Sequence, residues 1–388
     1  MVNIMRFPKP QNDCMKNSVM LTGIFRSGTT ILGKIMGSFK NVEYSYDPPI
    51  ISTLDYANLN GKLDGECVSG IFGTYMAQDI MLNYHHGRGY NIRVNDGSCI
   101  FNMKSHKEIE QRLKINGVNE ASKLMYELNS RLIWKSVVRF SIIPIFMKHY
   151  ENFKVVEIER DLKRLLSSLI KIGWFNKNEM KSEKYMGIWP YKEGYESKIP
   201  YMVSKETADL WDNSNVETNV ARLLNDLTKI RFDIKKIVKE QYPGSYLTIK
   251  YEDLLDNTSK VVNKIEKFTG MKRTSISEKW IKDVKPDELS ASPDVFFRSD
   301  DDMYYTLDQL GHDTTNMAEM TMAELATNYG YRWSEEHEGW YHRDEVADFA
   351  KGNFPKGVRR GLDESDDFEW IKNVPDTIPS REKRKRKK

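Results

Sequence analysis

The sequence has few cysteines, and their positions exclude two common kinds of site. Its three cysteines, Cys14, Cys67 and Cys99, are odd in number, far apart and outside any CxxC or Cys/His ligand pattern. Disulfide-stabilised domains instead carry even sets of cysteines at close spacing. We therefore expect no disulfide framework, no zinc site and a reducing, cytoplasmic location.

Long apolar segments are missing as well. No stretch approaches the roughly 18 consecutive apolar residues that a membrane-spanning helix requires. Residues 1–16 also lack the apolar segment of a signal peptide. We expect no membrane span.

The sequence has no large excess of one charge sign. It has 59 Lys and Arg against 56 Asp and Glu, a net charge of +3, and 39% of its residues are hydrophobic. This balance is typical of a globular protein and gives no reason to expect nucleic acid as a partner. The basic residues at 381–388 are an exception, but short basic termini are usually solvated.

What the sequence does contain is an alternation of short apolar runs and helical patterns. Strands are predicted over 18–24, 131–136, 154–159 and 246–250, and helices over 30–39, 142–150, 162–172 and 254–268. Helical spacing also covers 67–82 and 216–239. Alternating strands and helices predict an α/β fold with a mostly parallel central sheet and helices on both faces.

The composition changes after residue 280. Acidic runs occupy 300–302 and 363–367, and apolar residues are sparse between them. We expect a helix near 317–329 and otherwise a loosely ordered tail. The predicted organisation is an N-terminal extension over 1–17, one domain over 18–298, and a partly helical extension over 299–388 with a basic end.

A glycine loop between the first predicted strand and helix has the frame of a phosphate-binding loop. Its residues 23–30 read GIFRSGTT. Backbone amides can converge on an anion there, and the helix that begins near Thr29 adds its partial positive charge. Nucleoside-triphosphate enzymes place a lysine where Thr29 stands. The cation here is Arg26, whose guanidinium suits a shorter 5′-anionic group.

The segment TGIFRSGTTIL resembles the 5′-phosphosulfate loop of sulfotransferases that use 3′-phosphoadenosine 5′-phosphosulfate (PAPS). The segment 154–168 is similar to the family's 3′-phosphate element, with Arg160 at a strand end and Ser168 in the next helix. A helix starting near 162 would turn Ser168 toward the same anion as Arg160. The segments 134–139 and 246–270 are also family-like, so the resemblance extends over about 18–280.

The resemblance implies a P-loop NTPase-like sulfotransferase fold. It implies transfer of a sulfuryl group from PAPS to a hydroxyl or amine acceptor, a glycan or a small molecule, with release of PAP and without a metal. The implied donor-binding residues are Arg26, Ser27, Gly28, Thr29, Thr30, Arg160, Ser168 and Arg273. Arg26 is also implied to stabilise charge on the leaving oxygens. The resemblance gives no oligomeric state.

The resemblance leaves the catalytic base open between a carboxylate and a histidine. In carbohydrate and tyrosylprotein members a carboxylate follows the helix after the loop, and Asp47 has that spacing, although glutamate is usual there. The two prolines after Asp47 would hold it in a rigid turn. The small-molecule branch uses histidine, which makes His85, His86 and His106 alternatives. We favour Asp47 and a closer similarity to the carbohydrate and tyrosylprotein members.

Two other functions are compatible with the sequence. A P-loop kinase or nucleotide phosphohydrolase would need a magnesium-binding carboxylate at a strand end, and Glu157 and Glu159 are poor equivalents. A non-catalytic PAP-binding protein would keep the donor residues and lack turnover. Because Arg26, Arg160 and Ser168 are all present, the sequence favours an active transferase.

Overall fold

The computed structural model describes residues 9–93, 96–185, 189–284, 331–334 and 339–342. The helix expected near 317–329 and the basic end therefore lie outside the described residues. The chain forms two compact units. The first comprises Met1–Asp161, Met186–Pro190 and Ile230–Pro286, and the second comprises Leu162–Tyr185, Tyr191–Lys229 and Asp287–Lys388.

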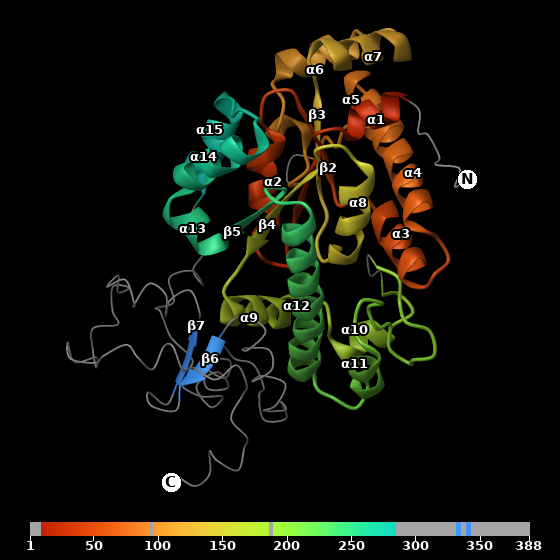
Figure 1. Ribbon diagram of the computed structural model, residues 1–388, viewed down its shortest axis with the longest axis vertical. Coiled ribbons are helices and arrows are strands. Elements are labelled where there is room, and N and C mark those ends of the chain that lie inside the picture. Colours follow the sequence, from red (N-terminus) through yellow and green to blue (C-terminus); the bar gives the residue numbers. More distant parts are fainter. Residues whose placement is uncertain (1–8, 94–95, 186–188, 285–330, 335–338, 343–388) are drawn as a thin grey trace, which may run out of the picture. The chain divides into compact units, whose positions relative to one another are not determined.

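The first unit is built on a five-stranded sheet in which all neighbouring strands are parallel (Figure 1). The strand order is β2-β3-β1-β4-β5. The strands are β1 (Val19–Thr22), β2 (Val42–Tyr46), β3 (Arg131–Lys135), β4 (Lys154–Glu159) and β5 (Tyr246–Lys250). The predicted α/β fold with a parallel sheet is confirmed. Because β1 is central, the loop that leaves it is flanked by the carboxyl ends of β3 and β4.

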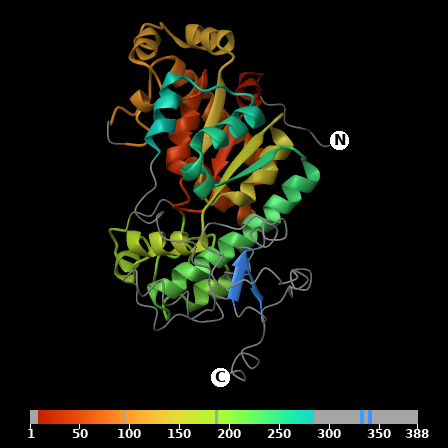
Figure 2. The same cartoon turned by 90° about the vertical axis from the view of Figure 1, so that its left-hand side faces the viewer.

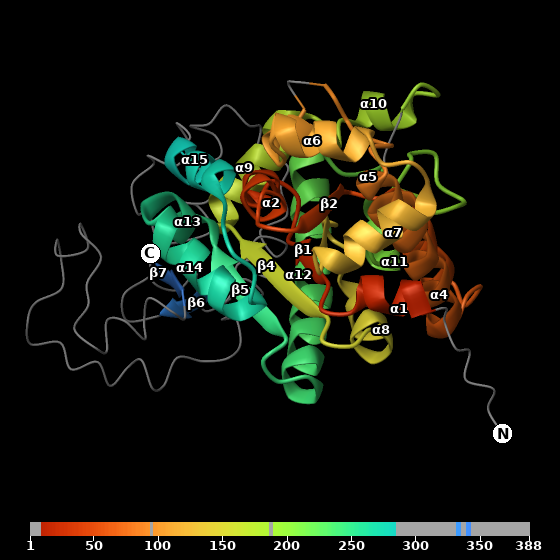
Figure 3. The ribbon, with the colours of Figure 1, turned by 90° about the horizontal axis from the view of Figure 1, so that it is seen from above.

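Helices cover both faces of this sheet (Figure 3). One face carries α2 (Thr29–Gly37), α13 (Tyr251–Asp256), α14 (Thr258–Thr269) and α15 (Ser275–Asp283). The other carries α1 (Lys9–Met15), α4 (Gly65–Tyr75) and α8 (Ile143–His149). Helix α3 (Ile50–Leu59) packs against α4 (Figure 1). A strand points alternate side chains to opposite faces, so each strand contributes to both cores.

The two cores follow from this alternation. On one face, Leu32 and Ile35 of α2 pack with Leu21 of β1 in a buried aliphatic cluster. On the other, the ring of Trp134 in β3 lies 5.3 Å from that of Phe72 and 5.9 Å from that of Phe146. Both cores fix the sheet whose carboxyl edge carries the phosphate loop.

Further helices stand at the amino-terminal end of the strands. The chain continues from α4 through a π-helical segment, Met76–Leu82, into α5 (Asn83–His85), as the helical pattern over 67–82 predicts. Helices α6 (His106–Leu113) and α7 (Val118–Glu127) follow and lead into the start of β3. Figure 2 shows them in gold at one end of the first unit.

The described part of the second unit is mainly helical. It contains α9 (Leu162–Ile172), α10 (Lys177–Lys181) and α11 (Lys205–Leu210), and α12 (Val216–Gln241) begins in it and ends in the first unit. Trp211 is fully buried and its ring lies 6.4 Å from that of Phe175. An antiparallel pair, β6 (Tyr331–Ser334) and β7 (Gly339–His342), also belongs to this unit.

Two elements differ from the prediction. Strand β2 was not expected, because its buried Glu43 breaks the apolar pattern of a buried strand. The helix expected over 254–268 is two helices, α13 and α14, because Asn257 adopts a non-helical backbone and its side chain accepts a hydrogen bond from the amide of Lys260, 3.0 Å away. In the described part of the chain, no helix combines the length and apolar character needed to cross a bilayer.

Candidate active site

The phosphate loop between β1 and α2 passes so close to its neighbours that two positions admit only glycine. A Cβ at Gly23 would lie 2.5 Å from the backbone oxygen of Ile158 in β4. A Cβ at Gly28 would lie 2.4 Å from the ring of Tyr251, and Gly28 has a φ of 91°. The loop is therefore held against the end of β4 and against Tyr251, the residue that follows β5.

Arg26 and Arg160 meet at this loop. Arg26 has an exposed side chain, and its backbone oxygen accepts a hydrogen bond of 2.9 Å from Nη1 of Arg160. Arg160 is buried directly after β4, with its guanidinium 4.7 Å from the ring centre of Tyr251. The ring face stabilises the buried cation. Arg160 thus supports the loop from its buried side. Ser168 is buried in α9 of the second unit.

Aromatic packing also supports the loop. Phe25 is buried, and its ring centre lies 5.3 Å from that of Trp189. Ser27 and Thr29 are buried as well, whereas Thr30 is exposed in the first turn of α2. The loop therefore presents Arg26 and Thr30 outward from a packed base.

Backbone strain is concentrated at the same edge of the sheet. Seven of the described non-glycine residues have a positive φ, and four of them are asparagines, which tolerate that conformation. The other three are Arg26 at 65°, Asp47 at 42° and Val138 at 56°. They follow β1, β2 and β3 respectively. Strained residues of this kind collect at functional sites, so the carboxyl edge is the candidate active site.

Asp47 forms an ion pair with the last residue of β3. Its Oδ2 lies 2.6 Å from Nζ of Lys135, and its amide donates a 3.0 Å hydrogen bond to the Lys135 carbonyl oxygen. The Lys135 side chain is 4% exposed, whereas that of Asp47 is 25% exposed. The cation is thus buried and the carboxylate remains accessible from outside.

Tyr46 connects this ion pair to the phosphate loop. The ammonium of Lys135 lies 3.7 Å from the ring centre of Tyr46, and the Tyr46 hydroxyl is 3.5 Å from Oγ1 of Thr30. We call Thr30, Tyr46, Asp47 and Lys135 the Asp47 cluster. Tyr46 could not be singled out from the sequence, because its contacts depend on the pairing of β2 with β3. The alternation in VEYSY is the signal that could have indicated this strand.

Arg139 holds the helix that follows Asp47. Its guanidinium donates hydrogen bonds of 2.7 and 3.2 Å to Oγ of Ser52. Nearby, the hydroxyl of Ser141 donates a 2.6 Å hydrogen bond to Asp55. Both acceptors belong to α3, which begins directly after the two prolines that follow Asp47. These bonds fix the turn that carries Asp47.

Arg273 is engaged by carboxylates. Its guanidinium pairs with Glu266 at 2.6 Å and with Glu278 at 3.4 Å. The residues after it form α15, whose first turn is closed by a capping box between Thr274 and Ser277. A phosphate that approached Arg273 would compete with both carboxylates.

The carboxylates of β4 are also paired. Lys235 lies 3.1 Å from Glu157 and 2.6 Å from Glu159, and Arg231 lies 3.5 Å from Glu159. Burial would raise the pKa of Glu159, but Arg231 and Lys235 hold it at about 2. In the part of the chain that the structure describes, no three His, Cys, Asp or Glu side chains gather as a metal site would require.

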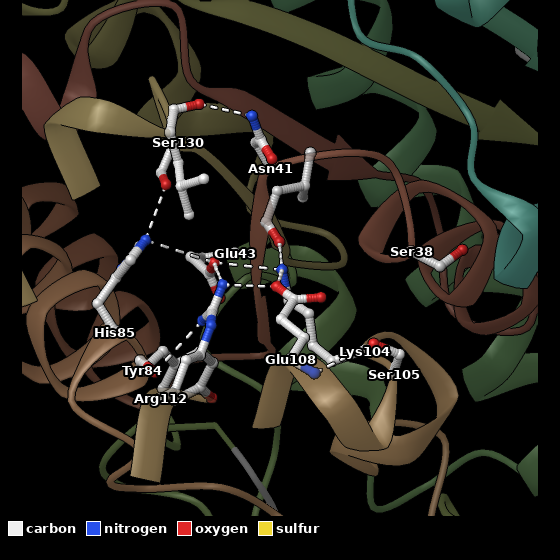
Figure 4. A network of polar contacts seen from close by, with 12 residues as sticks. Ser38, Asn41, Glu43, Tyr84, His85, Lys104, Ser105, Glu108, Arg112 and Ser130 are labelled. Atoms are coloured by element: carbon white, nitrogen blue, oxygen red, sulfur yellow. Dashed lines mark hydrogen bonds and ion pairs between the residues drawn. The ribbon is translucent and has the colours of Figure 1, made fainter. Parts of the chain in front are cut away.

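The three candidate histidines lie with other elements. His85 is fully buried, and its Nδ1 is 2.7 Å from the carbonyl oxygen of Met81, so Nδ1 carries the proton. Its Nε2 accepts a 2.7 Å hydrogen bond from Ser130 (Figure 4), and burial lowers the pKa of His85 below its ordinary value. His86 accepts from the amide of Gly117, and the ring of His106 stacks on Phe101.

His85 adjoins a buried ionic cluster, shown in Figure 4. Glu43 of β2 lies 2.7 Å from Arg112 and 3.2 Å from Lys104, and all three are at least 96% buried. Glu108 binds the same two cations from the surface, at 2.8 and 3.4 Å. Burial would raise the pKa of Glu43, but Lys104 and Arg112 hold it well below its ordinary value. We call Glu43, Lys104 and Arg112 the Glu43 cluster.

A pocket of about 660 Å³ opens beside the Glu43 cluster. It lies between the end of α2 at Ser38 and the helices α6 and α7, and side chains of both charges line it. Because the phosphate loop is at the other end of α2, this pocket is separate from the candidate active site.

One comparison with known proteins identifies a family for this chain. The model of the sulfotransferase domain matches residues 16–300. Similar solved structures include the sulfotransferase domain of the Synechococcus PCC 7002 olefin synthase, with 13% identity over 80% of this chain and 99% of that one and a TM-score of 0.37. STF1 of Mycobacterium tuberculosis H37Rv has 12% identity over 71% and 73% of the chains and a TM-score of 0.36. Mouse SULT7A1, solved with PAP, has 11% identity over 71% and 67% and a TM-score of 0.30. The sequence matches no curated protein.

Proposed function

Because the chain belongs to the sulfotransferase domain family, we propose that it transfers a sulfuryl group from PAPS to a hydroxyl or amine acceptor and releases PAP. The observation that carries this proposal is the phosphate loop flanked by cations. Lys135 ends β3 and Arg160 follows β4, one on each side of β1. Amides and cations arranged in this way suit an anionic donor.

Each part of the donor has a proposed set of contacts. The loop residues Ser27, Gly28, Thr29 and Thr30 would bind the 5′-phosphate. Arg160 would bind the 3′-phosphate, and the family resemblance adds Ser168 to that contact. We propose a structural role for Arg273, because it would have to leave Glu266 and Glu278 to join the donor site.

The proposed reaction is an in-line displacement at sulfur. The acceptor oxygen or nitrogen forms a bond to sulfur while the bond from sulfur to the 5′-phosphate oxygen breaks, and the electron pair leaves with PAP. Arg26 stabilises the charge that builds on the leaving oxygen. Asp47 accepts the proton of the acceptor, for which its partly exposed carboxylate at the site edge is suited.

A kinase or nucleotide phosphohydrolase is less compatible with the structure. Glu157 and Glu159 are occupied by Lys235 and Arg231, and β3 ends in a lysine at the edge where a magnesium-binding carboxylate would be needed. Thr29 also replaces the lysine of the phosphate loop. A catalytically inactive PAP-binding protein would bind PAP but transfer no label from ³⁵S-labelled PAPS to an acceptor.

Calorimetric titration tests the donor assignment. PAP is expected to bind about 100-fold more tightly than 5′-AMP, because hydrogen bonds to charged groups contribute about 1.5–3 kcal/mol each. Arg160→Ala should weaken binding of PAP much more than that of 5′-AMP. Arg88→Ala, which changes an exposed arginine outside the site, serves as the control. Equal affinities for PAP and 5′-AMP would contradict the proposed 3′-phosphate site. Binding of ATP with magnesium in preference to PAP would contradict the proposed transferase function.

Asp47→Asn tests the proposed base. The amide keeps the shape of the side chain but cannot accept the proton, so turnover should fall by about 10²–10⁴-fold. Transfer from ³⁵S-labelled PAPS to an acceptor found by screening measures this loss, and calorimetry should show an unchanged PAP affinity. His106→Gln is the matched control for a rival base. Normal turnover in Asp47→Asn would assign the base to another residue.

The domain limits and location are also proposed here. We assign the transferase domain to residues 18–298, with extensions on both sides. A cytoplasmic location is supported by the free thiols of Cys14, Cys67 and Cys99.

A further inference from the structure

Tyr46 contacts both halves of the candidate active site. Its hydroxyl is 3.5 Å from Thr30 at the start of α2, and its ring lies under the ammonium of Lys135. Neither role assigned above, donor binding or proton transfer, uses this side chain. The residue is 37% exposed, so burial in the core does not account for its position.

Lys135 depends on few partners. An ammonium has three N–H donors and is strongly hydrated in water, so burying it is costly unless it is paired. Among the described residues, two groups stabilise the charge of the Lys135 ammonium: the carboxylate of Asp47 at 2.6 Å and the ring of Tyr46 at 3.7 Å. The ring face therefore replaces part of the hydration that burial removes.

Strand register fixes this contact. Tyr46 and Lys135 are paired residues of the parallel strands β2 and β3, and each is the last residue of its strand. Side chains in register on neighbouring strands emerge on the same face of the sheet. The backbone at Gly97 lies beside the side chains of Tyr46 and Thr30, since a Cβ built there would lie 3.9 Å from Cε2 of Tyr46 and 2.9 Å from Cγ2 of Thr30.

We propose that Tyr46 is a positioning residue whose ring face holds the Lys135 ammonium against Asp47. The inference rests on the proposed function in one respect, the role of Asp47 as the base. The ring, and not the hydroxyl, performs this task, because the cation lies over the ring centre. Tyr46→Phe should therefore keep the contact between the ring and the Lys135 ammonium. Tyr46→Leu should remove this contact, although leucine is still a large apolar side chain.

Competitive acetylation of lysines with acetic anhydride, read by mass spectrometry, tests the contact without any donor. We measure the rate at Lys135 relative to Lys154, whose ammonium lies over Phe268 and donates to that residue's carbonyl oxygen. Tyr46→Leu should raise the relative rate about tenfold, the scale of a desolvated cation–π contact. Tyr46→Phe should stay within about twofold of the wild type. Unchanged melting temperatures would show that both variants are folded.

Turnover distinguishes a ring that positions Lys135 for the reaction from a ring that only shields Lys135 from solvent. If the ring positions Lys135, Tyr46→Leu should lower kcat about tenfold with unchanged PAP affinity, and Tyr46→Phe should retain kcat. Equal acetylation rates in all three proteins would overturn the inference, as would faster acetylation of Tyr46→Leu with a wild-type kcat. Absence of PAP binding by the wild type would instead refute the proposed function. The acetylation rates would still decide the contact in that case.

Discussion

Arg26→Ala is expected to lower turnover by about 10²–10³-fold, the loss caused by removing one donor from an oxyanion site. Arg26 has an exposed side chain at the tip of a loop whose backbone is fixed by Gly23, Gly28 and Arg160. The charge that it stabilises develops only as the bond to sulfur breaks. Its loss should therefore appear in kcat more than in the affinity for PAP.

The choice of alanine matters for this experiment. Arg26 has a φ of 65°, and alanine keeps the same Cβ, so the strain of the loop is nearly unchanged. Arg26→Gly would both remove the guanidinium and relax the strained backbone, so the two effects could not be separated. Arg26→Lys keeps the charge without the planar fork and should give an intermediate rate. If Arg26→Ala retained full kcat but bound PAP weakly, Arg26 would be a ligand of the ground state alone.

Glu43→Gln is expected to destabilise the first unit by about 3–5 kcal/mol, because it removes the buried carboxylate that pairs with Lys104 and Arg112 and leaves these two buried cations with the partly exposed Glu108. Glu43 is fully buried, and Arg112 and Lys104 are 1% and 4% exposed. Hydrogen exchange of the β2 and β3 amides measures this loss locally, which suits a chain with two units. Glu108→Gln is the matched control, since it removes a 37%-exposed carboxylate from the same cations and should cost about 1 kcal/mol or less.

The effect of Glu43→Gln should also depend on pH. The pKa of Glu43 is held below its ordinary value in the folded protein, so the unfolded chain takes up a proton first as the pH falls. The stability that Glu43 contributes is thus complete above its unfolded pKa of about 4.3 and declines below it. The difference between wild type and Glu43→Gln should narrow in acid. A constant difference from pH 7 to pH 3 would show that charge is not its origin.

The sequence predicted best what is encoded locally. Strands β4 and β5 and helix α9 lie at the predicted residues, because their apolar patterns are continuous and each lies between recognisable turns. The phosphate loop was predictable for the same reason. Its glycines, Arg26 and the start of α2 follow one another in the chain.

The rest depends on contacts between distant segments. Strand β2 contains a buried carboxylate that only Lys104 and Arg112, from another part of the chain, make tolerable. Without β2 in the sheet, the pairing of Asp47 and Tyr46 with Lys135 could not be foreseen. The sequence also does not indicate where the side chain of a basic residue near a predicted site points. Arg139, for example, donates a hydrogen bond to Ser52.

The position of Glu43 has a consequence for how the protein resists aggregation. β2 is an edge strand of the five-stranded sheet, and a strand of another molecule could in principle add to its open side. Natural sheets guard such edges with inward-pointing charges. A partly unfolded chain in which α6 moved away would separate Glu43 from Arg112 and leave the carboxylate without that partner on any interface formed there. The Glu43 cluster that stabilises β2 in the native sheet therefore makes the addition of a strand from another molecule to β2 unfavourable.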